Sequence, residues 1–134
     1  MTLRPLRIVL TAFAAEALSI ALLVLVVALF GPHERAQDAA FAERVGQWLG
    51  PLSGLVLCAL GGYFVARPLA GGQVLHGALL GLAAAAIDLA LLVLGGAPFQ
   101  LLFVLSNLGR VLAGCAGGWI AARQPAAAPR KSAG

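Results

Sequence analysis

Four long apolar stretches decide the class of fold that this chain can adopt. They occupy about residues 6–30, 48–67, 74–95 and 99–123 and together take up most of the chain. Each has the roughly 20 mostly apolar residues that a helix needs to cross the hydrocarbon core of a bilayer. None shows the strict alternation of a membrane β-strand. We therefore expect an all-α, four-pass transmembrane four-helix bundle over 1–123, followed by a disordered tail over 124–134.

The composition excludes a soluble globular protein. Hydrophobic residues make up 61% of the 134 residues, charged residues make up 10%, and the mean hydropathy is +0.97. A soluble domain of this size could not bury so much apolar surface, so the lipid bilayer is the expected environment. The run from 8 to 30 is too long for the apolar core of a typical signal peptide, and Glu16 interrupts it. We therefore expect an uncleaved first helix.

The positions of the basic residues predict the orientation of the chain. In a four-pass topology most of them fall at helix ends on one side, whereas the loop 31–47 on the other side holds more acidic than basic residues. Lys and Arg are concentrated on the cytoplasmic side of membrane proteins, so both termini are expected in the cytoplasm. The net charge of +4 then requires no nucleic acid as a partner. The residues on the basic side are Arg4, Arg7, Arg67, Arg123, Arg130 and Lys131.

The two halves of the sequence resemble each other. Residues 108–123 align with 52–67, and both segments end in Gly-Gly, an aromatic residue, two apolar residues and Ala-Arg. Residues 86–99 are identical to 17–30 at more than half of the aligned positions. We expect two helical hairpins that form a parallel internal repeat, related by a pseudo-twofold axis along the membrane normal.

Small residues recur at every fourth position in the second, third and fourth stretches. In lipid, such small-xxx-small faces let helix backbones approach closely, so we expect them to pack helices together. A pore or substrate path is the alternative, and the pattern does not distinguish contacts within one chain from contacts between chains. The expected packing residues are Gly46, Gly50, Gly54, Cys58, Gly62, Ala66, Gly77, Gly81, Gly114 and Gly118.

Ionisable residues inside the predicted helices form a candidate polar cluster. Arg110 lies near the midplane, and Glu16 and Asp88 lie at depths that its long side chain can reach. Ser19 and Asn107 lie one turn from Glu16 and Arg110. A buried charge needs a partner, so the cluster either fixes helix register or serves as a proton or cation site, because two acids and one base leave excess negative charge.

Other polar and aromatic residues have simpler expected roles. Trp48, Tyr63 and Trp119 fall near predicted interfaces, where aromatic side chains anchor helices. Residues 34–49 are expected to form either a short interfacial helix or an ordinary polar loop. Cys58 and Cys115 are expected to be small packed residues. No metal-binding, catalytic or nucleotide-binding motif appears, so we expect no metal, no cofactor and no catalytic residue.

One segment carries a resemblance. Residues 61–82 contain Gly61-Gly62, an aromatic residue, Arg67 after an apolar pair, and then His76-Gly77 with Gly81 four residues later. This pattern resembles one in small, uncharacterised bacterial inner-membrane proteins of about four helices. The resemblance implies a multi-pass protein of the bacterial inner (cytoplasmic) membrane and implies no activity.

Three classes of function are compatible with these features. We expect a non-enzymatic membrane subunit or scaffold that assembles through its small-residue faces, as a homo-oligomer or with a membrane-protein partner. The alternative is a small oligomeric transporter or proton-coupled permeation unit that uses Glu16, Asp88 and Arg110. An intramembrane enzyme is disfavoured, because no acid, base and nucleophile have the spacing that such chemistry needs.

Overall fold

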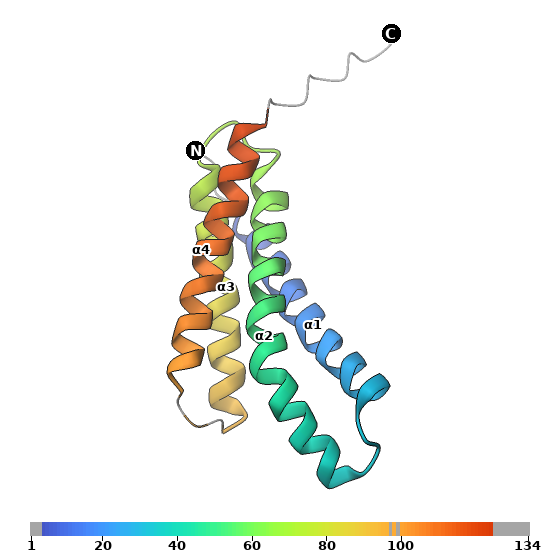
Figure 1. Ribbon diagram of the computed structural model, residues 1–134. Coiled ribbons are helices and arrows are strands. Elements are labelled where there is room, and N and C mark those ends of the chain that lie inside the picture. Colours follow the sequence, from blue (N-terminus) through green and yellow to red (C-terminus); the bar gives the residue numbers. More distant parts are fainter. Residues whose placement is uncertain (1–3, 97, 99, 125–134) are drawn as a thin grey trace.

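The computed structural model, which describes residues 4–96, 98 and 100–124, consists of four antiparallel helices joined by short connections (Figure 1). The described residues contain no β-strand, so the expected all-α fold is confirmed. Each helix is long and apolar enough to cross a membrane. Residues 125–134 of the expected tail lie outside the described part. The helices are α1 (Pro5–Phe30), α2 (Arg35–Ala66), α3 (Gln73–Leu94) and α4 (Leu101–Arg123).

The helices form two hairpins that are close at one end and separate at the other. Helix α2 packs against all three other helices, α3 also packs against α1 and α4, and α1 and α4 make no direct packing contact over the described residues. The hairpins α1/α2 and α3/α4 diverge toward their connections (Figure 1). We name this the open end, and we name the opposite end, where α2 ends and α3 begins, the closed end.

The internal repeat stays a prediction. An exact twofold relation between the hairpins would pair α1 with α4 in the way that it pairs α3 with α2. Helices α2 and α3 are in contact over the described residues, but α1 and α4 are not. Each hairpin consists of two consecutive helices, but the packing of one hairpin against the other departs from twofold symmetry.

The second helix begins much earlier than expected, at Arg35 and not near residue 48. Of the segment 34–49, residues 35–49 form neither a separate interfacial helix nor a loop, because they continue directly into the apolar part of α2, and Glu34 precedes the helix as its N-cap. The segment has no proline after Pro32 until Pro51, and Pro51 lies inside the helix. A 32-residue helix is about 48 Å long, so its acidic first turns extend beyond a hydrocarbon core of roughly 30 Å.

Glycine contacts hold the closed half of the bundle together. Gly114 of α4 faces Gly77 of α3, and a Cβ on either would overlap the carbonyl oxygen of the other. A Cβ on Gly62 of α2 would lie 2.5 Å from the carbonyl oxygen of Gly114, and a Cβ on Gly81 would lie 2.5 Å from that of Arg110. These glycines, with Gly118 against Gln73, let three backbones meet within one chain.

Most of the other residues expected in the packing face also contact helices of the same chain. Cys58 and Ala66 are fully buried, and Gly46 is in ordinary contact with Leu23 of α1. Gly50 differs from the expectation, because a Cβ there would have nothing within 4 Å. The outer surface of the bundle is covered by large apolar side chains, as expected of helices that are surrounded by lipid chains. Exposed examples are Phe13, Val24, Leu60, Val93 and Leu112.

The aromatic residues lie near the levels where an interface would be. Trp48 is 18 residues before the end of α2, which places it about 27 Å along the helix from Ala66. At the closed end, the Tyr63 hydroxyl donates to Gln124 Oε1 at 2.6 Å, and the Arg123 guanidinium lies 3.6 Å from the Trp119 ring centre. Trp48 and Tyr63 are 15 residues apart in α2, about 22 Å along the helix axis, which is less than the roughly 30 Å of a hydrocarbon core.

The turn between α2 and α3 depends on a glycine with a positive φ. Gly72 has φ 73° and its carbonyl accepts hydrogen bonds from the backbone and from Nδ1 of His76. A side chain is strained in this conformation, so Gly72→Ala should lower the free energy of unfolding by about 1–2 kcal/mol. The neighbouring Gly71 has open space around it and no positive φ, so Gly71→Ala is the matched control. Thermal unfolding in detergent would measure both, and equal stabilities would contradict this account of the turn.

Candidate functional site

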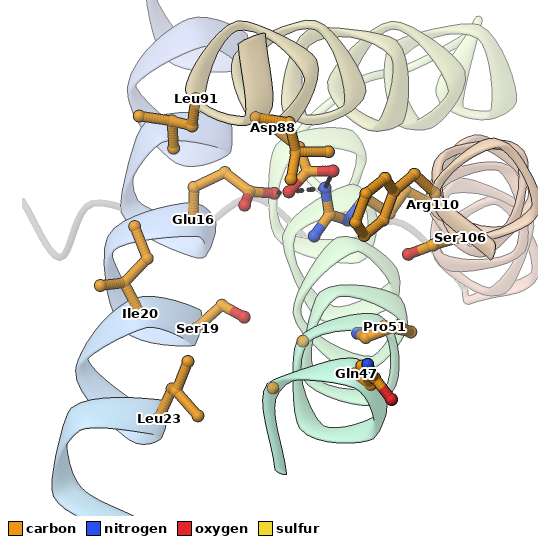
Figure 2. Close-up of a pocket in the computed structure, with 14 residues that line it drawn as sticks. Glu16, Ser19, Ile20, Leu23, Gln47, Pro51, Asp88, Leu91, Ser106 and Arg110 are labelled. Atoms are coloured by element: carbon orange, nitrogen blue, oxygen red, sulfur yellow. Dashed lines mark ion pairs between the residues drawn. The ribbon is translucent and has the colours of Figure 1, made fainter. Parts of the chain in front are cut away.

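A buried ion cluster connects three helices in the middle of the bundle. Arg110 of α4 has its Nη1 2.8 Å from Asp88 Oδ2 on α3 and 3.4 Å from Glu16 Oε1 on α1 (Figure 2). Arg110 is 3% exposed and Glu16 is 4% exposed, whereas the Asp88 side chain is 22% exposed. The arginine thus bridges α1 and α3, and it is the link between α1 and α4, which do not pack directly.

Asn107 completes the arginine–aspartate pair. Its Nδ2 donates to Asp88 Oδ2 and to the Phe103 carbonyl, each at 2.9 Å, and its Oδ1 accepts from Arg110 Nη1 at 3.3 Å. Asn107 and Arg110 are three residues apart on one helix, so their side chains are neighbours on the same face. Asp88 is consequently held by two donors from α4.

Glu16 is held more loosely than Asp88. Its Oε1 lies 3.4 Å from the arginine Nη1, and no hydrogen bond to this oxygen is formed by any described residue. Arg110 Nε is likewise buried without a hydrogen-bond partner in the described part of the chain. Buried polar groups are nearly always hydrogen-bonded, so these two atoms need a water or a ligand to satisfy them.

Ser19 does not contact the ions. Its hydroxyl is hydrogen-bonded to that of Ser53 on α2. The Ser53 hydroxyl also lies 3.2 Å from the Gly50 carbonyl oxygen, to which it can donate. Ser53 was not identified from the sequence, although it is the one serine or threonine in α2 and that signal could have pointed to it.

Gly54 makes room for the arginine. A Cβ at this position would lie 2.5 Å from Nε and 2.9 Å from Nη2 of Arg110. Arg110 occupies the position of α4 that aligns with Gly54 in the sequence repeat, and the two residues meet in the structure. The small residue of one helix therefore accommodates the guanidinium of the other, a role that the spacing of small residues alone did not predict.

The cluster forms the floor of a vestibule in the open half of the bundle. This cavity has a volume of about 280 Å³ and is lined by all four helices (Figure 2). Glu16 lies about 21 Å along α1 from its end at Phe30, and Arg110 lies about 14 Å along α4 from its start at Leu101. The charged floor is thus deep within the helices. Polar lining residues include Glu16, Ser19, Gln47, Asp88, Ser106 and Arg110.

Pro51 of α2 shapes the side of the vestibule. Proline has no amide proton, so the carbonyl of Gln47, four residues earlier, loses its normal helical donor. Both residues line the cavity. The N-terminal part of α2 leads away from α4 toward the open end (Figure 1). A proline inside a helix is a usual cause of a bend, and Pro51 lies in the stretch of α2 that lines the cavity.

Histidine and cysteine residues do not extend the cluster. His76 donates from Nδ1 to the Gly72 carbonyl at 2.9 Å, and its Nε2 is buried with no hydrogen-bond partner in the described structure. Cys58 and Cys115 are both free thiols. Across residues 4–96, 98 and 100–124, no group of three or more His, Cys, Asp or Glu side chains is arranged to hold a metal ion.

No protein-family model, no curated protein and no solved structure matches this chain. The resemblance carried by residues 61–82 therefore remains an expectation. What the chain can do has to be argued from the vestibule and from the ion cluster at its floor.

Proposed function

We propose that this chain is an integral membrane protein that binds a small cation at the floor of the vestibule and takes part in its permeation. The closed end carries Arg4, Arg7, Arg67 and Arg123, so we propose that it faces the cytoplasm of a bacterial cell and that the vestibule opens on the opposite side of the inner membrane. Both termini are then cytoplasmic, and the ligand enters from outside.

The observation that carries the proposal is the unsatisfied carboxylate of Glu16. One guanidinium serves two carboxylates, and Asp88 receives the shorter ion contact and the amide of Asn107. Glu16 Oε1 receives no hydrogen bond from a described residue, and Glu16 lines the vestibule. A cation with N–H donors, such as ammonium or guanidinium, would satisfy this oxygen and neutralise the excess charge. Ionisable groups within membrane helices often mark such ion or proton paths.

The small-residue faces offer less support for an assembly function than the sequence suggested. Gly62, Gly77, Gly81, Gly114 and Gly118 meet backbones of the same chain, so they are already occupied. A non-enzymatic scaffold would have to use other surfaces. We include oligomer formation in the proposal for a different reason. The glycine contacts close one half of the bundle, so the vestibule does not continue to the closed end within the described residues of a single chain. Four helices rarely enclose a complete path, so permeation would require more than one chain.

Two carboxylate variants separate a binding role from a structural one. Glu16→Gln should lower guanidinium binding and liposome flux at least tenfold with a smaller loss of stability than Asp88→Asn, because Glu16 makes the longer of the two contacts with Arg110, at 3.4 Å. Asp88→Asn should lower guanidinium binding and also the free energy of unfolding, because it weakens the 2.8 Å ion pair that bridges α3 and α4. Isothermal titration with guanidinium and flux assays per folded molecule would measure this, with Glu43→Gln on the exposed part of α2 as control.

Wild-type binding by Glu16→Gln would contradict the cation site and leave the cluster a structural one. Native mass spectrometry of the protein from its own membrane tests the assembly. A homo-oligomer supports permeation by this chain. A stoichiometric foreign subunit would instead make the chain an accessory component and would favour the subunit role expected from the sequence.

A further inference from the structure

A second cavity lies on the other side of the α1/α2 hairpin. It is a groove of about 560 Å³ between the two helices, and its walls are almost entirely aliphatic. Several lining side chains are strongly exposed, Leu52 and Val56 at 59% each, so the groove opens to the surroundings of the bundle. In a bilayer these surroundings are lipid chains. The groove is lined by residues that include Leu22, Leu25, Leu52, Val56, Leu57 and the single hydroxyl of Ser53.

Only a thin wall separates the groove from the vestibule. Ser19 lines the vestibule and Ser53 lines the groove, and the two hydroxyls are hydrogen-bonded to each other. One turn further toward the open end, Gly50 lines the vestibule and has nothing within 4 Å of a Cβ position. Beyond it, a Cβ on Gly46 would lie 3.5 Å from Leu23 Cδ2, and both residues line the vestibule. The linings of the two cavities therefore meet at the hydrogen-bonded serine pair.

We propose that the vestibule and the groove are two halves of one site for a single-chain amphiphile from the bilayer, with a small cationic head group and an alkyl tail. This proposal rests on the proposed function, because it takes the cation site at Glu16 and names the class of molecule that supplies the cation. The head group occupies the vestibule beside Glu16, and the tail lies between α1 and α2.

The dimensions and the charges of the two cavities support this division. Pockets for drug-sized ligands span roughly 300–1,000 Å³, so a vestibule of about 280 Å³ has room for a head group and not for a tail as well. Its floor has one more negative than positive side chain, which complements an ammonium or guanidinium group. The groove has no charged lining residue and fits an alkyl chain.

The serine pair is the passage between the halves. When the hydrogen bond between the serines breaks, a bound ammonium or guanidinium head group can donate to the freed hydroxyl oxygens in its place. The ligand can therefore enter sideways from the membrane while its tail stays in an apolar environment, and it need not cross the aqueous mouth of the vestibule.

A photoreactive probe tests the site in nanodiscs that hold the full chain. The probe is dodecylguanidinium with a diazirine at the tail end, and the competitor is methylguanidinium. Labelling should map to the groove, and saturating methylguanidinium should lower it at least tenfold by occupying the head-group half. Val56→Trp, which fills the groove, should lower labelling at least tenfold. Leu60→Trp, one turn along the same exposed face and outside the groove, should leave labelling unchanged.

Results other than those expected would reject either the two-part site or the proposed function as a whole. Equal labelling of Val56→Trp and Leu60→Trp, or labelling that methylguanidinium does not reduce, would mean that the groove is covered by ordinary lipid chains, and the two-part site would be rejected. If methylguanidinium nevertheless binds in a Glu16-dependent manner, the proposed cation site stands without the amphiphile. If neither molecule binds, the proposed function itself fails. Gel filtration and circular dichroism of both tryptophan variants establish that they are folded.

Discussion

Replacing Arg110 with alanine should lower the free energy of unfolding by about 3–5 kcal/mol, the largest loss expected from a single side chain in this protein. The guanidinium is 3% exposed and lies between two carboxylates. Its removal leaves Glu16 and Asp88 buried without a counter-charge, and it also leaves a space above Gly54. In addition, α1 loses its link to α4.

A second variant distinguishes the cost of the unpaired buried charges from the cost of the space that the arginine leaves. Neutralising both acids in the same chain, as Glu16→Gln and Asp88→Asn together with Arg110→Ala, should recover a large part of the stability, because no buried charge remains. Reversible unfolding in mixed detergent, followed by circular dichroism, would measure both variants. Arg44→Ala, on the exposed part of α2, is the control for loss of one positive charge. A loss below about 1 kcal/mol for Arg110→Ala would show that the pairs do not form.

Replacing Gly114 with alanine should lower the free energy of unfolding by about 2–3 kcal/mol, although it adds a single methyl group. The added Cβ would overlap the carbonyl oxygen of Gly77 and come within 3.2 Å of the Gly81 amide nitrogen. Both are backbone atoms, so the strain can be relieved only by moving α3 away from α4. Gly62 of α2 packs on the same residue, so two interfaces open together.

A matched glycine shows whether the effect comes from this close approach. Gly46 is also helical, and a Cβ there would lie 3.5 Å from Leu23 Cδ2, an ordinary van der Waals contact. Gly46→Ala should therefore cost nothing, or stabilise the protein by up to about 1 kcal/mol through helix propensity. Equal unfolding free energies for the two variants, measured in one detergent, would contradict the close backbone contact between Gly77 of α3 and Gly114 of α4.

The polar cluster could be predicted in part because depth along a helix can be counted from the sequence. Each residue advances about 1.5 Å, so Glu16, Asp88 and Arg110 could be assigned to overlapping levels before any packing was known. Asn107 followed from its place one turn from Arg110. Ser19 was assigned to the same cluster on the same reasoning, but it faces Ser53, because rotation about the helix axis cannot be counted in this way.

The sequence by itself determined the number of helices, their apolar character and the residues at which most of them end, because these depend on local composition and on glycine and proline. It did not determine the length of α2, since helix-forming residues over 35–47 are compatible with either an interfacial segment or a continuous helix. The tertiary structure alone decided which helix faces meet. The spacing of small residues marked a packing face on three helices, but it did not show which helix each face would meet, because in lipid the pairing depends on the fit of the two surfaces. Gly54 beneath Arg110, the Ser19–Ser53 bond and the vestibule all follow from that fit.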